Sequence, residues 1–288
     1  MRKLILSILI IFLISCSSND TTDFVLDQNL YEDNKLEDYE LFEKSNAFIS
    51  SNELDLALKE IDKIDVLFPS SPYANKGMLL SAYIYFLKKD YEKTRAIAQN
   101  FKKYYPGNKN IVYANYLDAM TYYVLIKKPD YSQKNAYKAL DKFNFLINAY
   151  PNSRYEIDII TRLKILDNNI AANKLSTAKF YYDKDNYYGS LIYLKDIFQN
   201  HNSSLSIQET LYYLTKIYKY IDEIDIGKEY AAILAYNFPN SIWYEKSYNL
   251  IYDIEIQQNK KGWFNKFNPI KLFINDQNEE NSEIQKID

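Results

Sequence analysis

Side chains that commonly carry out catalysis are scarce in this 288-residue chain. It contains one histidine, His201, and one cysteine, Cys16, so the chain cannot form a zinc site of histidine and cysteine ligands, or an internal disulfide. His201 lies at a predicted turn, where we expect a solvated ring rather than the base of a serine hydrolase. The sequence has neither a phosphate-binding P-loop nor a glycine-rich dinucleotide turn. We therefore predict a protein that is not an enzyme and binds no metal or cofactor.

Carboxylates are the remaining candidates for catalysis. They are spread along predicted helix faces, where Asp and Glu usually form solvated pairs with lysines four residues away, as expected for Asp55 and Lys59. A hydrolytic or carbohydrate-binding protein would need two carboxylates facing each other across a groove, about 5–10 Å apart. The sequence leaves that alternative open.

Cys16 is the residue whose surroundings predict a covalent modification. Two basic residues precede an apolar run over 4–14, which is shorter than the roughly 20 residues of a membrane-spanning helix. The sequence Leu13-Ile14-Ser15-Cys16 looks like a lipobox, which implies a diacylglycerol on the cysteine sulfur, cleavage of a signal peptide over 1–15 and acylation of the new amino group. Ser17 follows the cysteine, whereas an aspartate at that position would tend to retain such a lipoprotein at the inner membrane. We therefore expect a lipid anchor on the periplasmic face of the outer membrane; an ordinary signal peptide or an uncleaved anchor is the alternative.

The composition narrows the class of protein further. Hydrophobic residues make up 47% of the chain, enough for a buried core. Five glycines and seven prolines are too few for a turn-rich all-β fold. A net charge of −3 without a basic patch argues against nucleic acid as a partner. No second apolar run reaches membrane-spanning length, so we expect the lipid to be the membrane attachment.

A proline turn recurs along the chain at a spacing typical of helical repeats. Its prolines at Pro69, Pro106, Pro151 and Pro239 are 37, 45 and 88 residues apart, and the double interval predicts a degenerate copy with His201 in the proline position. The residue twelve positions earlier is small in all five copies: Ala57, Thr94, Ala139, Gly189 and Gly227. The residue twenty-one positions earlier is aromatic in four copies: Phe48, Tyr85, Phe180 and Tyr218. The third copy has Asp130 there, because 127–130 is an insertion.

This pattern predicts an all-α fold, an α-solenoid of five tetratricopeptide-like helix pairs with a C-terminal capping helix. A small residue lets two helices approach closely, and proline ends one pair before the next begins. The predicted parts are a signal peptide (1–15), a lipid-proximal tether (16–36), the solenoid (37–258) and a C-terminal tail (259–288) whose last part is disordered. Within the solenoid we predict helix pairs at about 37–68, 71–104, 109–150, 152–200 and 204–238, followed by the capping helix at 240–258. The inner face of the capping helix is predicted at Tyr244, Tyr248, Ile251 and Tyr252.

The combined order of these features resembles the BamD family, the lipoproteins of the β-barrel assembly machinery. The resemblance rests on the acylated leader, the five repeats, the sequence from Phe68 to Ala74, the charged insertion in the third repeat and the sequence from Tyr150 to Tyr155. It is densest between Ala139 and Tyr188, where matching positions are Phe143, Leu146, Ile147, Arg162, Ala171, Tyr181 and Tyr182.

The resemblance implies a scaffold and receptor in the assembly of outer-membrane β-barrels. In that family the C-terminal repeats dock on a POTRA domain of the insertase BamA, other lipoproteins of the machinery join, and the N-terminal repeats engage unfolded barrel proteins. Carried over to this chain, the substrate region comprises Phe68, Pro69, Ser71, Pro72 and Tyr73.

Residues expected to bind the partner are Arg162, Tyr193, Trp263 and Phe264. Family members commonly carry an arginine on the second helix of the fourth repeat, where this chain has Tyr193, so the same ion pair cannot form. Trp263 and Phe264 either anchor a partner or fold back on the capping helix. The competing function is a tetratricopeptide lipoprotein that serves as an adaptor for peptidoglycan synthesis or hydrolysis, or for cell-division proteins.

Overall fold

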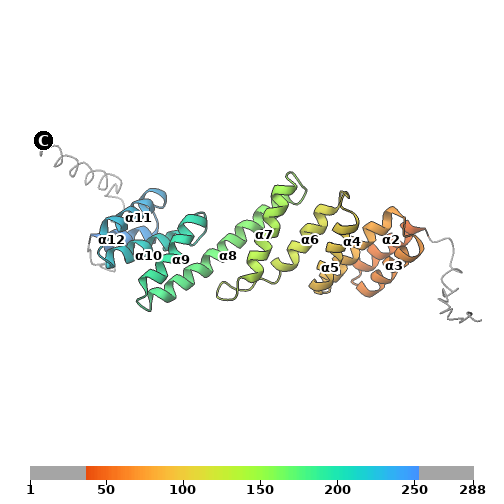
Figure 1. Cartoon of the computed structure of the whole chain (residues 1–288), viewed down its shortest axis with the longest axis horizontal. Coiled ribbons are helices and arrows are strands. Elements are labelled where there is room, and N and C mark those ends of the chain that lie inside the picture. Colours follow the sequence, from red (N-terminus) through yellow and green to blue (C-terminus); the bar gives the residue numbers. More distant parts are fainter. Residues whose placement is uncertain (1–36, 253–288) are drawn as a thin grey trace, which may run out of the picture. The chain divides into compact units, whose positions relative to one another are not determined.

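The structure is a computed structural model of the whole chain, and it describes residues 37–252. Within that range it contains eleven helices and no strand, so the predicted all-α helical-repeat fold is confirmed (Figure 1). The helices are α2 (Asp38–Ser50), α3 (Leu54–Leu67), α4 (Pro72–Leu87), α5 (Tyr91–Tyr104), α6 (Ile111–Tyr123), α7 (Lys134–Ala149), α8 (Glu156–Tyr182), α9 (Tyr187–Asn200), α10 (Ile207–Tyr220), α11 (Ile224–Asn237) and α12 (Ile242–Ile251).

The chain divides into two compact units, 1–77 and 78–288, and the division falls inside α4. In the first unit α2 packs on α3. Its core consists of Leu41, Ile64 and Ala74, with partly buried aromatic rings around them. In the second unit, contacts between helices run along the sequence, from α5 with α6 to α11 with α12. Contacts between sequence neighbours are the arrangement expected of a helical repeat, in which stacking supplies the core.

The turn inside four of the helix pairs has one recurring geometry. A residue with positive φ (Asn52, Lys89, Asp185 or Asp222) is followed by one whose N–H donates back to a carbonyl five residues earlier. This is the hydrogen-bonding pattern of a Schellman motif, which ends a helix by satisfying its last carbonyls. The accepting carbonyls belong to Phe48, Tyr85, Tyr181 and Tyr218, at donor–acceptor distances of 2.8, 2.9, 3.0 and 2.8 Å.

This geometry corrects the predicted alignment of the fourth pair by one residue. The second helices end at residues with closely similar backbones, namely Phe68, Tyr105, Tyr150, His201 and Phe238. His201 therefore occupies the aromatic position, and Asn202 follows in the proline position. The small residue of this pair is then the buried Ser190 rather than Gly189. The aromatic residue is Tyr181 rather than Phe180, which is 59% exposed.

The small positions permit close helix contacts, as the repeat pattern predicted. Ala57, Thr94 and Ala139 are fully buried. At Gly227 an added Cβ would lie 3.2 Å from the backbone oxygen of Thr215, closer than most such contacts. A larger residue there would push α11 away from α10.

The insertion in the third pair packs against α8, a helix of 27 residues. The side-chain amide of Gln133 donates to the carbonyls of Pro129 and Tyr131, at 3.0 and 2.9 Å. From α8, Asn173 donates to the same Pro129 carbonyl and Ser176 donates to Asp130. One half of α8 packs with α6 and α7, and the other half packs with α9 and α10.

Helix α12 closes the described part of the chain. The hydroxyl of Ser241 caps its first turn by accepting from the N–H of Trp243 at 3.2 Å. Tyr244 and Ile251 are buried, and Tyr248 packs on the same core. The capping helix was predicted over 240–258, so its observed start at Ile242 is two residues later than predicted. The part of the prediction beyond Tyr252 lies outside the described residues.

Candidate functional site

The predicted substrate residues lie at the start of α4, in the first unit. The hydroxyl of Ser71 accepts from the N–H of Tyr73 at 2.9 Å and donates to the carboxylate of Asp38, so it caps α4 and joins it to α2. Pro72 is the first helical residue, where the absence of an N–H costs nothing. Pro69 and Pro72 are exposed. These residues shape the turn that presents the neighbouring aromatic rings.

Four aromatic residues, Tyr39, Phe42, Phe68 and Tyr73, form what we call the N-terminal aromatic cluster. The ring of Tyr73 lies 5.3 Å from that of Phe42 and 5.8 Å from that of Tyr39, between centroids. Phe68 packs on the same small core. The ammonium of Lys76 lies 4.4 Å from the Tyr73 centroid, and Tyr39 is 50% exposed. The cluster therefore offers ring faces beside a positive charge, a combination that contacts both apolar and anionic groups.

Arg162, on α8, is paired inside the second unit. Its Nε and one terminal nitrogen donate to the two carboxylate oxygens of Asp158, at 2.6 and 2.9 Å. Its guanidinium carbon lies 4.7 Å from the ring centroid of Tyr123 on α6. A two-pronged contact of this kind is strong and fixes the orientation of the guanidinium. The charge predicted to meet a partner is thus already neutralised within the protein.

Tyr116 completes this contact from α6. Its hydroxyl donates to Oδ2 of Asp158 at 2.7 Å, and its ring stacks on Tyr155 at 4.6 Å. Burial, followed by the hydrogen bond to Asp158, raises the pKa of Tyr116 to about 12. Burial alone would raise the pKa of Asp158, but the hydrogen bonds from Arg162 and Tyr116 outweigh it and lower that pKa. The group is a closed, charge-balanced connection between α6 and α8.

Tyr193 lies on α9 and is partly buried. Its ring stacks against that of Tyr181 on α8, with centroids 5.7 Å apart and planes 14° apart. Two apolar residues of the same helix are much more exposed, Tyr188 at 78% and Ile192 at 56%. The surface at the position of the family's arginine therefore consists of aromatic and aliphatic groups.

His201 is not solvated, contrary to the prediction from its turn position. It is 8% exposed, with Nδ1 2.6 Å from Oδ1 of Asp167 and Nε2 3.0 Å from the ammonium of Lys174. Lys174 also pairs with Asp196. Burial alone would raise the pKa of Asp196, but the hydrogen bonds from Lys174 and Asn200 outweigh it and lower that pKa. Because the ammonium of Lys174 can only donate, Nε2 of His201 accepts from it. Nδ1 therefore carries the ring hydrogen and donates a hydrogen bond to Asp167. The network connects the turn after α9 to α8.

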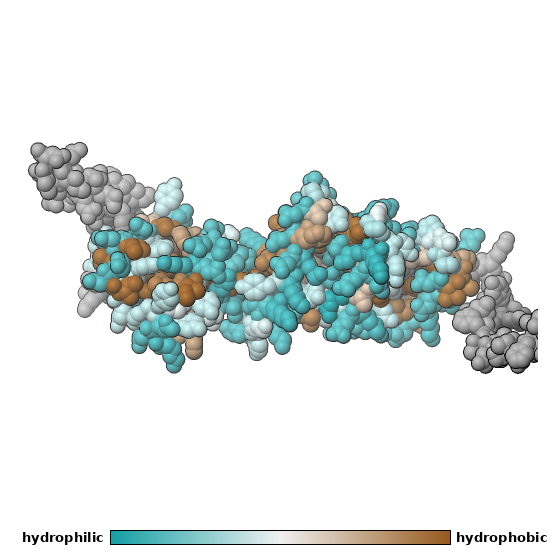
Figure 2. Space-filling model, viewed as in Figure 1, coloured by the Kyte–Doolittle hydropathy of each residue, from teal (hydrophilic) through white to brown (hydrophobic). Residues whose placement is uncertain are grey.

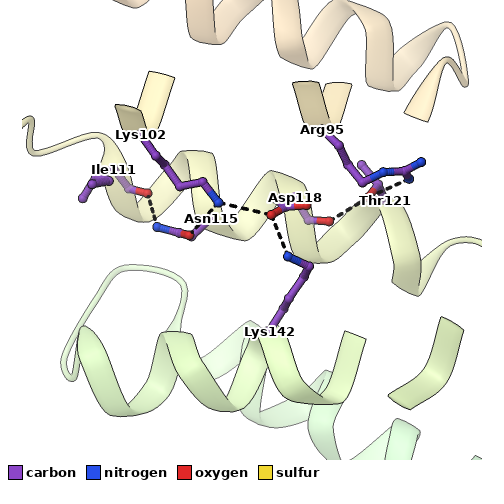
Figure 3. A network of polar contacts seen from close by, with 7 residues as sticks. All are labelled: Arg95, Lys102, Ile111, Asn115, Asp118, Thr121 and Lys142. Carbon is purple, nitrogen blue, oxygen red and sulfur yellow. Dashed lines mark hydrogen bonds and ion pairs between the residues drawn. The ribbon is translucent and has the colours of Figure 1, made fainter. Parts of the chain in front are cut away.

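Asp118, on α6, is a buried carboxylate between two neighbouring helices. Lys102 from α5 and Lys142 from α7 approach its Oδ2 from opposite sides, at 3.2 and 2.8 Å (Figure 3). Its side chain is 2% exposed, whereas those of the lysines are 25% and 33% exposed. Its Oδ1 is buried and has no hydrogen-bond partner among residues 37–252. One carboxylate therefore serves two cations and leaves one oxygen unused.

Two more cations contact the adjacent turn of α6, at Thr121 and Tyr122. Arg95 donates to the hydroxyl of Thr121 at 3.3 Å (Figure 3). Its guanidinium carbon lies 4.9 Å from the ring centroid of Tyr122. The ammonium of Lys138 lies 5.1 Å from the same centroid. We call Arg95, Lys102, Lys138 and Lys142 the basic site. This site was not predicted from the sequence. Its one local sign is the pair Lys138 and Lys142, four residues apart on α7, and such a pair does not by itself indicate a binding site.

Three residues assigned a role from the sequence lie outside the described residues, namely Cys16, Trp263 and Phe264. Among residues 37–252, no helix is both long enough and apolar enough to cross a membrane. The same residues contain no group of three or more His, Cys, Asp or Glu side chains placed to hold a metal ion.

Comparison with known proteins gives the family. Residues 34–234 match the model of the family described as "YfiO: Outer membrane lipoprotein". The match spans well over half of the chain. The chain belongs to this family. The predicted resemblance to BamD is thereby confirmed, because curated members of that name match over most of the chain.

Three relatives, each with the name "Outer membrane protein assembly factor BamD", illustrate the match. That of Rickettsia prowazekii is 28% identical over 211 residues, covering 73% of this chain and 84% of the relative. That of Caulobacter vibrioides is 25% identical and covers 64% and 61%. That of Neisseria gonorrhoeae is 26% identical and covers 84% and 93%. The N-terminal aromatic cluster, Arg162, Tyr193, His201 and the basic site all lie in the part that matches the family.

Proposed function

We propose that this member of the YfiO/BamD family is a non-catalytic scaffold and receptor for assembling β-barrel proteins in the outer membrane. The observation that carries the proposal is the family match over 34–234, together with relatives named as outer membrane protein assembly factors. The helical-repeat fold supports it, because stacked helix pairs provide long surfaces for other proteins.

The membrane attachment that we propose is a diacylglycerol and an acyl chain on Cys16, at the periplasmic face of the outer membrane. The lipobox and the family description support it. Several acyl chains on one residue hold a protein far more firmly than a single chain, because each buried methylene contributes about 0.8 kcal/mol.

We assign binding of unfolded barrel proteins to the N-terminal aromatic cluster. Tyr39 is half exposed and contacts Tyr73, so a segment arriving from solvent can stack on both rings. Pro69, Ser71 and Pro72 hold the turn beside it, and Lys76 supplies a charge for an anionic group. Replacing the exposed Tyr39 by Ala should weaken binding of an unfolded barrel segment, whereas Tyr104→Ala, at a similarly exposed residue of the second unit, should not.

We assign docking on a BamA-like insertase, through its POTRA domain, to the C-terminal helix pairs. Tyr188 and Ile192 beside the Tyr181–Tyr193 stack form an exposed apolar surface, and such surfaces commonly mark protein contacts. On the face in view in Figure 2, hydrophobic residues also gather over α10 to α12. Trp263 and Phe264 are further candidates from the sequence, and other lipoproteins of the machinery are expected nearby. A docking role for Arg162 would require breaking its contact with Asp158.

Depletion of the protein in living cells tests the proposal. Barrel proteins should fall in outer-membrane fractions, because their receptor is lost; normal levels would contradict the proposal. The variant Cys16→Ala should move the protein out of the membrane fraction while leaving its helix content unchanged, since the lipid anchors rather than folds it.

Pull-down from detergent-solubilised envelopes separates the competing functions. Recovery of a barrel protein with POTRA domains supports the assembly function, whereas recovery of peptidoglycan synthases, hydrolases or division proteins alone supports the adaptor. The variant Tyr188→Ser/Ile192→Ser should lose the insertase. Leu205→Ser, at a residue 84% exposed elsewhere in the same unit, is the matched control.

A further inference from the structure

The basic site combines four cations with one carboxylate in a protein whose net charge is negative. Asp118 pairs with Lys102 and Lys142, and the site therefore carries three more positive than negative charges. The two helices that supply the cations, α5 and α7, both pack on α6. Asp118 lies on α6 between Lys102 and Lys142 (Figure 3). Tyr122 belongs to the same helix.

Arg95 and Lys138 are the cations without a counter-charge. Within residues 37–252 neither forms an ion pair, and their contacts are the hydroxyl of Thr121 and the ring of Tyr122. A ring attracts a cation through its quadrupole but neutralises none of its charge. The nearest carboxylates along the same helices, Glu92 and Asp141, are exposed and form no ion pair with either residue in the described structure.

The spacing of the cations suits a narrow ligand. Arg95 and Lys102 are seven residues apart on α5, which is about 10 Å along a helix axis. On an extended chain, side chains of one face recur about every 7 Å, so carboxylates two and four residues apart, at about 7 and 13 Å, bracket this separation within the reach of flexible arginine and lysine side chains. Lys102 and Lys142 are only 25% and 33% exposed, so a thin chain reaches them more readily than a flat layer of lipid headgroups does.

We propose that the basic site binds an extended acidic segment of a partner protein. Carboxylates of that segment would pair with Arg95 and Lys138 at the edges of the site and share Lys102 and Lys142 with Asp118. The ring of Tyr122 would contact the aliphatic part of the segment. This inference stands apart from the proposed function, because no part of it depends on the N-terminal aromatic cluster or on the surface of α9.

Fluorescence anisotropy with the full-length lipoprotein in detergent micelles tests it. The probe is a labelled peptide of alternating glutamate and serine, with a glutamine–serine peptide for comparison. The glutamate peptide should bind, more weakly as salt rises, because exposed ion pairs are screened. Arg95→Gln/Lys138→Gln should weaken binding about tenfold, the effect of two lost ion pairs. Lys103→Gln/Lys164→Gln removes the same charge from exposed positions of α5 and α8 and should change affinity less than about twofold.

Each remaining outcome decides the proposal. Equal losses in the two double variants would overturn it, because general charge would then explain binding. Binding to phosphatidylglycerol vesicles but not to the peptide would assign the site to the membrane instead. Should neutralising Glu279, Glu280 and Glu283 raise peptide affinity, the chain's own tail would be the occupant. If the first double variant unfolds, the single Lys138→Glu, at an exposed residue, should by itself weaken binding about tenfold, because it changes the charge of the site by the same amount.

Discussion

Asp118 and Asp158 both connect α6 to a neighbouring helix, yet their hydrogen bonds differ. Asp158 receives three hydrogen bonds from one arginine and one tyrosine, and both of its oxygens are used. One oxygen of Asp118 pairs with two lysines, and its other oxygen has no partner in the described part of the chain. The first group is neutral and closed, whereas the second leaves positive charge in excess.

The difference shows why the type of residue alone does not identify a binding cation. Arg162 matches a position of the BamD pattern and was expected to meet a partner, but its charge is used within the protein. Arg95 and Lys138 match no motif, yet their charges have no counterpart among the described residues. The partners within the fold decide which cation can attract a ligand.

The largest expected effect is that of Asp118→Asn. Removing the shared carboxylate leaves two partly buried lysines without a counter-charge, and we expect a loss of about 2 kcal/mol in the free energy of unfolding, less than for a fully buried pair because the lysines can reach water. The same change should tighten binding of the glutamate peptide several-fold, because Asp118 no longer competes for the lysines. Urea unfolding and anisotropy measure the two effects.

Asp141→Asn is the control and should leave stability unchanged, because Asp141 is exposed on α7 and forms no ion pair with any residue of 37–252. If Asp118→Asn weakened the peptide interaction while the protein stayed folded, the carboxylate would be a ligand-orienting group rather than a competitor. The contrast between a closed group at Asp158 and an excess of positive charge at Asp118 would then be wrong.

Arg162→Met should lower the free energy of unfolding by about 1 kcal/mol, because it removes a two-pronged contact to a carboxylate that is 43% exposed and can be hydrated instead. Affinity for the glutamate peptide should not change, since the charge of Arg162 is already neutralised. Chemical unfolding and the same anisotropy assay provide the measurements. A loss of affinity as large as that of Arg95→Gln/Lys138→Gln would place both regions in one binding surface.

The helix pairs could be predicted because their signals are local. Ala57 and Thr94 must be small, and Pro69 must end a pair, whatever lies elsewhere in the chain. The one-residue error in the fourth pair arose at His201, whose ring takes the aromatic position. Its partners Asp167 and Lys174 lie 34 and 27 residues away, so no local pattern indicates that it is buried.

The basic site could not be predicted for the same reason. In the sequence, Asp118 is indistinguishable from other polar residues of an amphipathic helix. Only the packing of the helices brings it between Lys102 and Lys142, which are 16 and 24 residues away along the chain. The predicted turn at Ser71 and Tyr73, in contrast, lies within one short segment. Its geometry follows from a cap and a proline at the first helical position.

Tyr116→Phe should cost about 0.5–1 kcal/mol at neutral pH, the usual contribution of one hydrogen bond, because the ring stack with Tyr155 remains. The folded protein holds the pKa of Tyr116 at about 12, above its ordinary value of 10.0. The resulting stabilisation is therefore complete below pH 10 and is lost as the pH rises toward 12. Between pH 10 and 12 the free energy of unfolding should fall less steeply in the variant than in the parent protein. Tyr104→Phe, at an exposed ring, should match the parent protein.

The smallest effect concerns Asp158 in acid. Its pKa in the folded protein is lowered from 3.8, because hydrogen bonds from Arg162 and Tyr116 outweigh the cost of its burial. A carboxyl with a lowered folded pKa stabilises the protein above its unfolded pKa, and the stabilisation disappears as the pH falls through the folded value. Asp158→Asn should thus be less stable than the parent at neutral pH, and the difference should shrink in acid by some tenths of a kcal/mol, since the group is partly hydrated.

Unfolding midpoints measured from neutral pH to about pH 2 test this expectation. Asp225→Asn serves as the control, because Asp225 is 91% exposed and its contact with Lys228 is solvated. A difference between Asp158→Asn and the parent that stays constant with pH would show that Asp158 keeps its ordinary pKa. The contact with Arg162 would then contribute shape rather than charge, and the contrast with Asp118 would rest on packing alone.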